Sequence, residues 1–316
     1  MIEIKNLTKN FGNIKALEDV SFTVNKGEIL GFLGPNGAGK TTAMNIITGF
    51  IPSTSGTVTI DGFDIMDSPK EAKRKIGYLP EQPPLYMDMT VKEYLNFICD
   101  LKSVPRAKRK SQIDDIMYLV KIGDKRDRLI KNLSKGYKQR VGLSQALVGN
   151  PEVLILDEPT VGLDPKQIIE IRKLISALGK EHTIILSSHI LPEVSAVCSN
   201  IVIINNGKIV IKGTSDSFSS ATNLVTKFTV SVDGPVNNVQ NLLRSLDDVS
   251  YVEHLRSEKD ISTFLIESIA DIDARRSTFF GLAKAGYAIL ELKPMGTSLE
   301  EVFLSVISKE TQIKED

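Results

Sequence analysis

The sequence predicts an α/β domain followed by a smaller α+β domain, and three observations support this class. Short β-rich runs alternate with helical patterns through the first half of the chain, which is typical of a parallel sheet covered on both faces. A stretch rich in serine and threonine at 215–223 then interrupts the pattern. Beyond it the order becomes β-α-β-β-α-β, which is typical of a ferredoxin-like sandwich. We therefore expect domains at 1–217 and 224–316.

The elements of the first domain follow from the spacing of its apolar residues. Alternating apolar residues predict a strand at 20–24, and an apolar run predicts another at 28–33. Further strands are expected at 57–60, 75–79, 153–156, 183–186 and 201–204. Asn206-Gly207 then predicts a hairpin with 208–211, because both central residues of such a turn need a positive φ.

From about 88 to 140 the β signals vanish and apolar residues recur at helical spacing, which predicts a helical subdomain. Within it, the segment 102–140 has 13 lysines and arginines against 4 acids, a local net charge of +9. The whole chain has 39 basic and 39 acidic residues, so no overall field would draw it onto nucleic acid. The basic segment is either a solvated face or a surface for anionic lipid headgroups.

The second domain is expected to contain the elements of the sandwich in order. Strands are predicted at 228–232, 250–255, 261–266 and 288–292, with helices at 239–246 and 273–285. Ser298 and Glu301 form a capping-box pattern that predicts a final helix. We expect one face of this helix to pack against another surface, because its apolar residues Leu299, Val302, Phe303, Val306 and Ile307 recur at helical spacing.

Residues 34–41 read GPNGAGKT and match the phosphate-binding loop G-x-x-x-x-G-K-[ST]. The match follows an apolar strand and opens a helix, so backbone N–H groups and the helix dipole can bind phosphates. We expect Lys40 to reach the β- and γ-phosphates and Thr41 to offer its hydroxyl to Mg²⁺. The predicted nucleotide-binding residues of this segment are Gly34, Pro35, Asn36, Gly37, Ala38, Gly39, Lys40, Thr41 and Thr42.

Two carboxylates, Asp157 and Glu158, follow the apolar run at 153–156. They would stand at the carboxyl end of a buried parallel strand, where such sheets bind their ligands. Asp157 is therefore the expected Mg²⁺ ligand, directly or through water. Glu158 is expected to accept a proton from an attacking water molecule.

With these motifs in place, LSKGYKQR at 133–140 resembles the signature of the ATP-binding subunits of ABC transporters. Gly162-Leu163-Asp164 is similar to the D-loop of the same family, and the resemblance covers about residues 1–215. It implies the P-loop NTPase fold of an ABC cassette, in which His189 is the switch histidine. It also implies that Phe11 stacks on the adenine base, with modest selectivity for the nucleotide.

The family's Q-loop glutamine has two candidates here. Counting back from Leu85-Tyr86 places Glu81 at that position, with Gln82 one residue later and nearly as well placed. Either side chain would contact Mg²⁺ or the attacking water.

The resemblance also implies an assembly of two chains. In the family, the signature of one copy completes the nucleotide site of another, so Ser134 and Gly136 would contact the nucleotide of a second chain. Lys135 and Tyr137 stand where the family consensus has glycine and glutamine, which alters the shape of this surface. We expect a homodimer, or a pair with a related chain, around two ATP and Mg²⁺.

The function that the resemblance implies is ATP hydrolysis that powers a separate transmembrane permease. The Lys-Gly-Tyr signature variant, the Leu-Pro-Glu-Gln run and the C-terminal extension resemble the branch of multidrug, polysaccharide or gliding exporters. Residues 83–87 with Met89 are either a docking surface for the permease or ordinary packing. The alternative function is that of a soluble ABC ATPase acting on a ribosome or DNA, although those forms carry two cassettes or long inserts.

The expected location is the cytoplasmic face of the membrane. No apolar run approaches the roughly 18 to 20 residues needed to cross a bilayer, and the first residues lack a signal-peptide pattern. Membrane contact is expected only through the permease or the basic segment. No nucleic-acid partner is expected.

Overall fold

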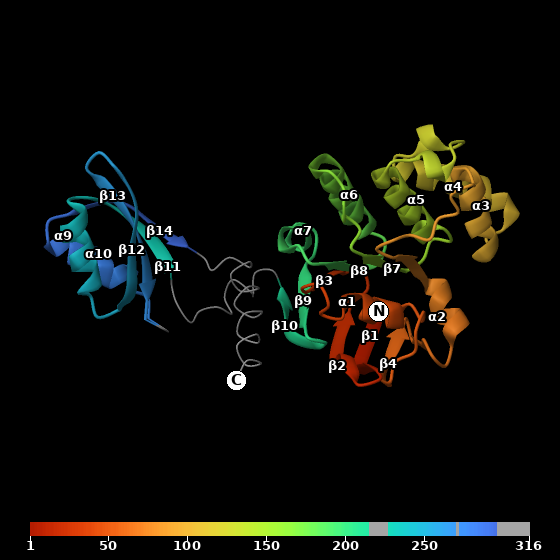
Figure 1. Cartoon of the computed structure of the whole chain (residues 1–316), viewed down its shortest axis with the longest axis horizontal. Coiled ribbons are helices and arrows are strands. Elements are labelled where there is room, and N and C mark those ends of the chain that lie inside the picture. Colours follow the sequence, from red (N-terminus) through yellow and green to blue (C-terminus); the bar gives the residue numbers. More distant parts are fainter. Residues whose placement is uncertain (215–226, 270–271, 296–316) are drawn as a thin grey trace. The chain divides into compact units, whose positions relative to one another are not determined.

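The computed structural model describes residues 1–214, 227–269 and 272–295 of the chain. The chain divides into two compact units after residue 214 (Figure 1), and each unit has its own hydrophobic core. The stretch at 215–223 and the final helix expected around 298–307 lie outside the described residues.

A six-stranded sheet with the order β10-β9-β3-β8-β7-β6 forms the centre of the first unit. β3 (Ile29–Leu33) pairs in parallel with β8 (Thr183–Ser188) and with β9 (Asn200–Asn205). β7 (Val153–Asp157) pairs in parallel with β8 and with β6 (Ile76–Leu79). Every residue of β7 and β8 is buried, which explains their continuous apolar sequence. The strands predicted for this parallel sheet are confirmed.

The hairpin predicted at Asn206-Gly207 is also confirmed. It joins β9 to β10 (Lys208–Thr214), and the two turn residues have φ values of 46° and 78°. Gly207 donates its N–H to the carbonyl of Ala38 at 3.0 Å and accepts a hydrogen bond from the N–H of Glu18 at 2.8 Å. The turn is therefore bonded to the backbone of the phosphate-binding loop.

A second, antiparallel sheet of the first unit has the order β2-β1-β4-β5. Its strands are β1 (Ile2–Phe11), β2 (Ile14–Val24), β4 (Ser55–Ile60) and β5 (Phe63–Asp64). The strands expected at 20–24 and 57–60 are parts of β2 and β4, whereas β1 and β5 had not been predicted. One continuous core joins this sheet to the central sheet.

Helices complete the first unit. Three helices and two short 3-10 turns correspond to the helical subdomain that the sequence predicted, and α3, α4 and α5 lie together in Figure 1. The helices of the unit are α1 (Lys40–Ile47), α2 (Pro69–Lys75), α3 (Val91–Leu101), α4 (Arg106–Leu119), α5 (Lys135–Leu147), α6 (Pro165–Leu178) and α7 (Leu191–Ser195). None of the helices in the described ranges is long and apolar enough to span a membrane.

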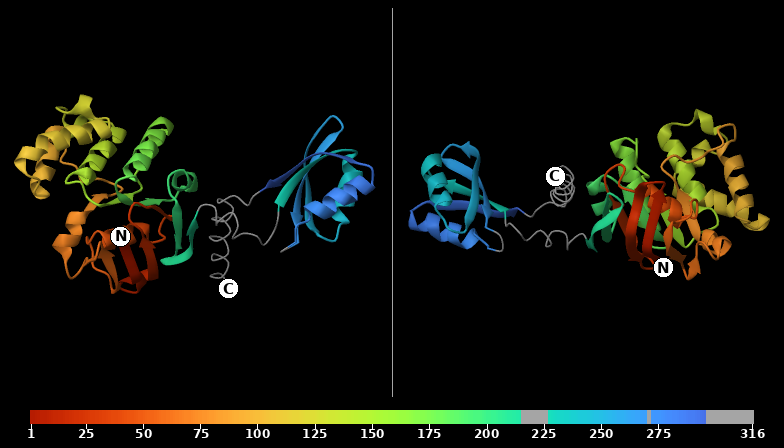
Figure 2. Two further views of the ribbon diagram at one scale, coloured as in Figure 1. Left: turned by 180° about the vertical axis from the view of Figure 1, so that it is seen from behind. Right: turned by 60° about the horizontal axis from the view of Figure 1, so that its bottom comes forward.

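The second unit has the predicted order β-α-β-β-α-β. Its antiparallel sheet has the order β12-β13-β11-β14, and the two helices within its described residues lie on one face of that sheet (Figure 2). The elements are β11 (Lys227–Asp233), α9 (Val236–Arg244), β12 (Val249–Glu258), β13 (Ile261–Ser268), α10 (Arg275–Lys284) and β14 (Ala288–Met295). Phe228, Val230 and Val232 alternate into the core beneath the helices, as a half-buried strand requires.

Candidate functional site

The phosphate-binding loop connects the end of β3 to α1, as its motif requires. Gly39 precedes the helix with a φ of 105°, and a Cβ atom there would lie 2.7 Å from the carbonyl oxygen of Ala16. The buried Lys40 folds back over the loop and donates to the carbonyls of Gly34 at 2.8 Å and Pro35 at 3.2 Å. The loop therefore presents a cation and the free N–H groups of a helix N-terminus at one place.

Glu158 lies beside this lysine at the end of β7. Its Oε1 is 3.4 Å from Lys40 Nζ, and its Oε2 is 2.9 Å from Nδ1 of His189. Glu158 is 5% exposed, and its φ of 48° is unusual for a residue other than glycine. The ends of the neighbouring strands β7 and β8 and the start of α1 thus bring together three of the predicted side chains.

Asp157 is fully buried beside Glu158, and its environment fits a metal ligand. Ser187 donates its hydroxyl to Oδ1 of Asp157, whereas Oδ2 has no hydrogen-bond partner among the described residues. Burial raises the pKa of Asp157, the hydroxyls of Ser187 and Thr41 lower it, and the carboxylates of Glu158 and Glu81 raise it further. An unpartnered carboxylate oxygen near a threonine hydroxyl suits Mg²⁺, which proteins commonly hold with few side chains and the substrate's phosphates.

Ser187 had not been predicted to belong to the site. Besides binding Asp157, its hydroxyl accepts a hydrogen bond from the N–H of Glu158 at 3.0 Å. The available signal was a hydroxyl residue in a buried strand, two residues before the predicted His189. One side chain of β8 thereby orients both acids at the end of β7.

Three other predicted residues have exposed side chains. Glu81 and Gln82 are both exposed, and Glu81 is close enough to affect the pKa of Asp157. Phe11 is 50% exposed at the end of β1, with Nζ of Lys9 5.0 Å from its ring centroid. An aromatic surface is therefore accessible at this position.

The signature residues have surroundings of their own. Ser134 is the exposed N-cap residue of α5, and its hydroxyl makes no capping hydrogen bond. Gly136 is covered by α6, because a Cβ atom there would lie 2.4 Å from Oε1 of Gln167. A Cβ atom added at Gly162 would lie 1.8 Å from Nζ of Lys135, so the Lys135 side chain packs directly against this glycine. The signature thus contacts the D-loop region and α6 of its own chain.

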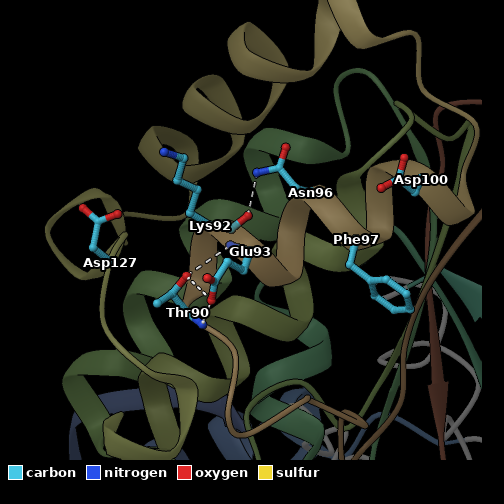
Figure 3. Close-up of a pocket in the computed structure, with 7 residues that line it drawn as sticks. All are labelled: Thr90, Lys92, Glu93, Asn96, Phe97, Asp100 and Asp127. Atoms are coloured by element: carbon cyan, nitrogen blue, oxygen red, sulfur yellow. Dashed lines mark hydrogen bonds between the residues drawn. The ribbon is translucent and has the colours of Figure 1, made fainter.

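A pocket of about 470 Å³ lies over α3 (Figure 3), and none of its lining residues belongs to the cluster around Glu158. Its lining is formed by Thr90, Lys92, Glu93, Asn96, Phe97, Asp100 and Asp127. Thr90 and Glu93 form a capping box, in which the Glu93 carboxylate accepts the N–H and the hydroxyl of Thr90 at 2.8 and 2.9 Å. These contacts fix the start of α3.

The fold and the site define the class of this protein as a P-loop ATPase of the ATP-binding cassette type. Residues 17–161 match the family model described as ABC transporter. The chain belongs to this family as an ABC transporter ATP-binding protein, and the cassettes of the family are ATPases.

Relatives match along nearly the whole chain. The ABC transporter ATP-binding protein YxlF of Bacillus subtilis (strain 168) is 34% identical over 309 residues, which are 97% of this chain and 99% of YxlF. The linearmycin resistance ATP-binding protein LnrL of the same strain is 31% identical, over 98% of this chain and 99% of LnrL. Among solved structures, the dimeric post-hydrolysis cassette MJ0796 bound to ADP and Pi has a TM-score of 0.62 and 27% identity. This match covers 68% of this chain and 98% of the cassette.

Proposed function

We propose that the chain is the ATP-hydrolysing subunit of an exporter, that it dimerises around two Mg·ATP and that it drives a separate transmembrane permease. The observation that carries this proposal is the position of the Glu158 carboxylate, which is buried between Lys40 and His189 at the end of β7. Such a carboxylate beside a phosphate-binding loop suits the activation of water more than the binding of phosphate alone.

The proposed reaction is in-line attack of water on the γ-phosphate. Glu158 orients this water or accepts its proton, and His189 holds the γ-phosphate from the neighbouring strand. Lys40 exchanges its bonds to the loop carbonyls for bonds to the β- and γ-phosphates. Thr41 and Asp157 would hold Mg²⁺, with Glu81 or Gln82 near it. When bound, the ion neutralises charge that develops on the phosphate oxygens.

The second chain of the proposed dimer contributes its signature. Ser134 is exposed with an uncommitted hydroxyl at the N-terminus of α5, a position suited to an anion. Ser134 and the backbone of Gly136 would therefore bind the γ-phosphate held by the opposite chain. The dimeric state of the related ADP-bound cassette supports this arrangement. The partner is a second copy or a related cassette chain.

The permease is proposed to bind through the exposed segment around Tyr86 and Met87, whose side chains are 53% and 43% exposed. A relative from Haemophilus influenzae is named as the ATP-binding protein of a lipopolysaccharide export system, which supports an export function. The proposed location is the cytoplasmic face of the membrane, with no nucleic-acid partner. The basic segment 102–140 would lie near anionic headgroups only in the assembled transporter.

Purification of the tagged chain from detergent-solubilised membranes of its native host tests the proposed partner. An integral membrane protein should co-purify in stoichiometric amount, and a double substitution of Tyr86 and Met87 by serine should release it while ATP binding persists. Recovery of ribosomal or DNA-bound material in place of a membrane protein would contradict the export function.

A further inference from the structure

Glu193 on α7 is a buried carboxylate outside the predicted set of site residues. It is 4% exposed, and its Oε2 accepts hydrogen bonds from the hydroxyl of Thr160 and, at 3.4 Å, from the hydroxyl of Ser188. Thr160 follows Glu158 by two residues, and Ser188 directly precedes His189. One carboxylate oxygen therefore joins the two loops that carry the proposed catalytic side chains.

The charge of Glu193 is only loosely compensated. Among the described residues its ion-pair partner is Arg172 on α6, whose Nη2 lies 3.8 Å from Oε1, beyond hydrogen-bonding distance. A buried carboxylate without a close ion pair is costly, and a neutral side chain of similar size would commonly be tolerated at a purely structural position. The two hydroxyl donors are thus the main partners of this group among the described residues.

The turn that Glu193 holds is strained. The backbone of Glu158 has a φ of 48°, and such a conformation persists only where the surrounding structure enforces it. Ser187 binds the N–H of Glu158 at 3.0 Å, and the carbonyl of Glu158 accepts the N–H of Val161 at 3.2 Å. The bond from Thr160 to Glu193 anchors the far side of the same turn.

We propose that Glu193 is a positioning residue for ATP hydrolysis, which keeps the Glu158 carboxylate and the His189 ring at the separation that hydrolysis needs. Glu193 acts through Thr160 and Ser188 and touches neither nucleotide nor water. This inference rests on the proposed function. Small displacements of a catalytic group lower the rate strongly, so Glu193→Ala should lower kcat roughly 10- to 100-fold, with the KM for ATP changed less than about twofold.

The test compares Glu193→Ala with Glu193→Gln and with a matched control, Glu93→Ala. Glu93 is also a glutamate that accepts a threonine hydroxyl, but it does so at the start of α3 (Figure 3). Steady-state ATP hydrolysis, nucleotide affinity and thermal unfolding are measured for each full-length protein. Glu193→Gln keeps one acceptor oxygen and should recover much of the lost kcat. Glu93→Ala should lower the melting temperature and leave kcat unchanged.

A double-mutant comparison isolates the proposed contact. Thr160→Val removes the hydroxyl at nearly constant volume, and its loss of kcat should not add to that of Glu193→Ala, because both remove the same bond. Thr160→Val also serves as the test if Glu193→Ala does not fold.

An unchanged kcat in folded Glu193→Ala, or equal thermal destabilisation of the Glu193 and Glu93 variants without loss of kcat, would overturn the inference. The proposed function fails separately, if wild-type protein does not hydrolyse ATP or if Glu158→Gln hydrolyses it normally.

Discussion

Replacement of Glu158 by glutamine preserves the shape of the side chain and removes its charge from a buried pair. At the 3.4 Å between Glu158 Oε1 and Lys40 Nζ, two unit charges attract by roughly 5 kcal/mol at an effective dielectric constant of about 20. Without nucleotide, Lys40 of the variant keeps only its hydrogen bonds to the two loop carbonyls. Breaking a buried ion pair costs about 3 to 5 kcal/mol, and we expect the free energy of unfolding of the nucleotide-free protein to fall by part of that amount.

ATP should reverse the sign of this effect. The phosphates of ATP replace the negatively charged partner of Lys40 that the substitution removes. The substitution also removes the Glu158 carboxylate, which repels the phosphates. ATP affinity should therefore be equal to or higher than that of the wild type, and the ATP-bound dimer should accumulate. The chemical step loses its proton acceptor, which is typically worth a factor of about 10² to 10⁴ in rate, or roughly 3 to 5 kcal/mol of barrier.

The assay is phosphate release at saturating Mg·ATP, combined with size-exclusion chromatography in the presence of ATP. Glu152→Gln is a matched control, because Glu152 is a largely exposed carboxylate at the other end of β7 that pairs with Lys75. This control should hydrolyse ATP like the wild type. Normal turnover by Glu158→Gln would refute the assignment of Glu158 as base or water-positioning residue. A loss of ATP binding would equally refute the charge argument.

Three further predictions concern other parts of the molecule. Lys40→Ala should lose ATP affinity, and Ser134→Ala should lose only hydrolysis. A mixture of the two variants should nevertheless be more active than either parent, because each mixed dimer contains one intact shared site. No gain in phosphate release, with mixed dimers shown by cross-linking, would contradict the shared site. Burial raises the pKa of Asp157, so the folded state favours the protonated carboxyl. The stability that this group contributes is present at low pH and is lost as pH rises through the raised pKa. Asp157→Asn should accordingly raise the melting temperature of the nucleotide-free protein at pH 8 and abolish Mg²⁺-dependent hydrolysis, and a lower melting temperature would count against this reasoning. Phe264→Ala should destabilise the second unit by about 3 to 5 kcal/mol, because Phe264 is fully buried in its core. ATP hydrolysis should remain near the wild-type rate, and its loss would mean that the second unit supports the nucleotide site.

The fold could be predicted where the sequence pattern reflects burial directly. β7 and β8 are buried on both faces, so their apolar runs stand out. β1 does not stand out in the sequence, because it mixes buried, half-buried and exposed residues and its pairing with β2 changes register three times. The start of α6 carries a sequence signal, an aspartate followed by a proline, that could have predicted this helix. Asp164 caps the helix by accepting the N–H of Gln167 at 2.9 Å, and Pro165 follows at its first position.

The candidate site could be predicted where a local motif or the end of a strand defines it. The positions of Asp157 and Glu158 follow from a parallel strand whose carboxyl end lies at the ligand-binding edge of the sheet, whereas His189 was assigned from the resemblance to the family. Ser187 and Glu193 could not be recognised in this way, because their contacts arise only when β8 and α7 pack against the turn after β7. The roles of Ser134 and Gly136 in a second chain stay predictions.

The partners of β3 have a consequence for the order of events during synthesis. This strand and its loop are made long before the strands on either side of β3, which come from 183–188 and 200–205, and before Gly207, whose N–H binds Ala38. A nascent chain therefore carries an unsupported phosphate-binding loop until the hairpin of β9 and β10 has left the ribosome. Pairing between such distant segments is slow. We therefore expect ATP to stabilise the finished cassette, by mass action, more than any earlier stage of folding.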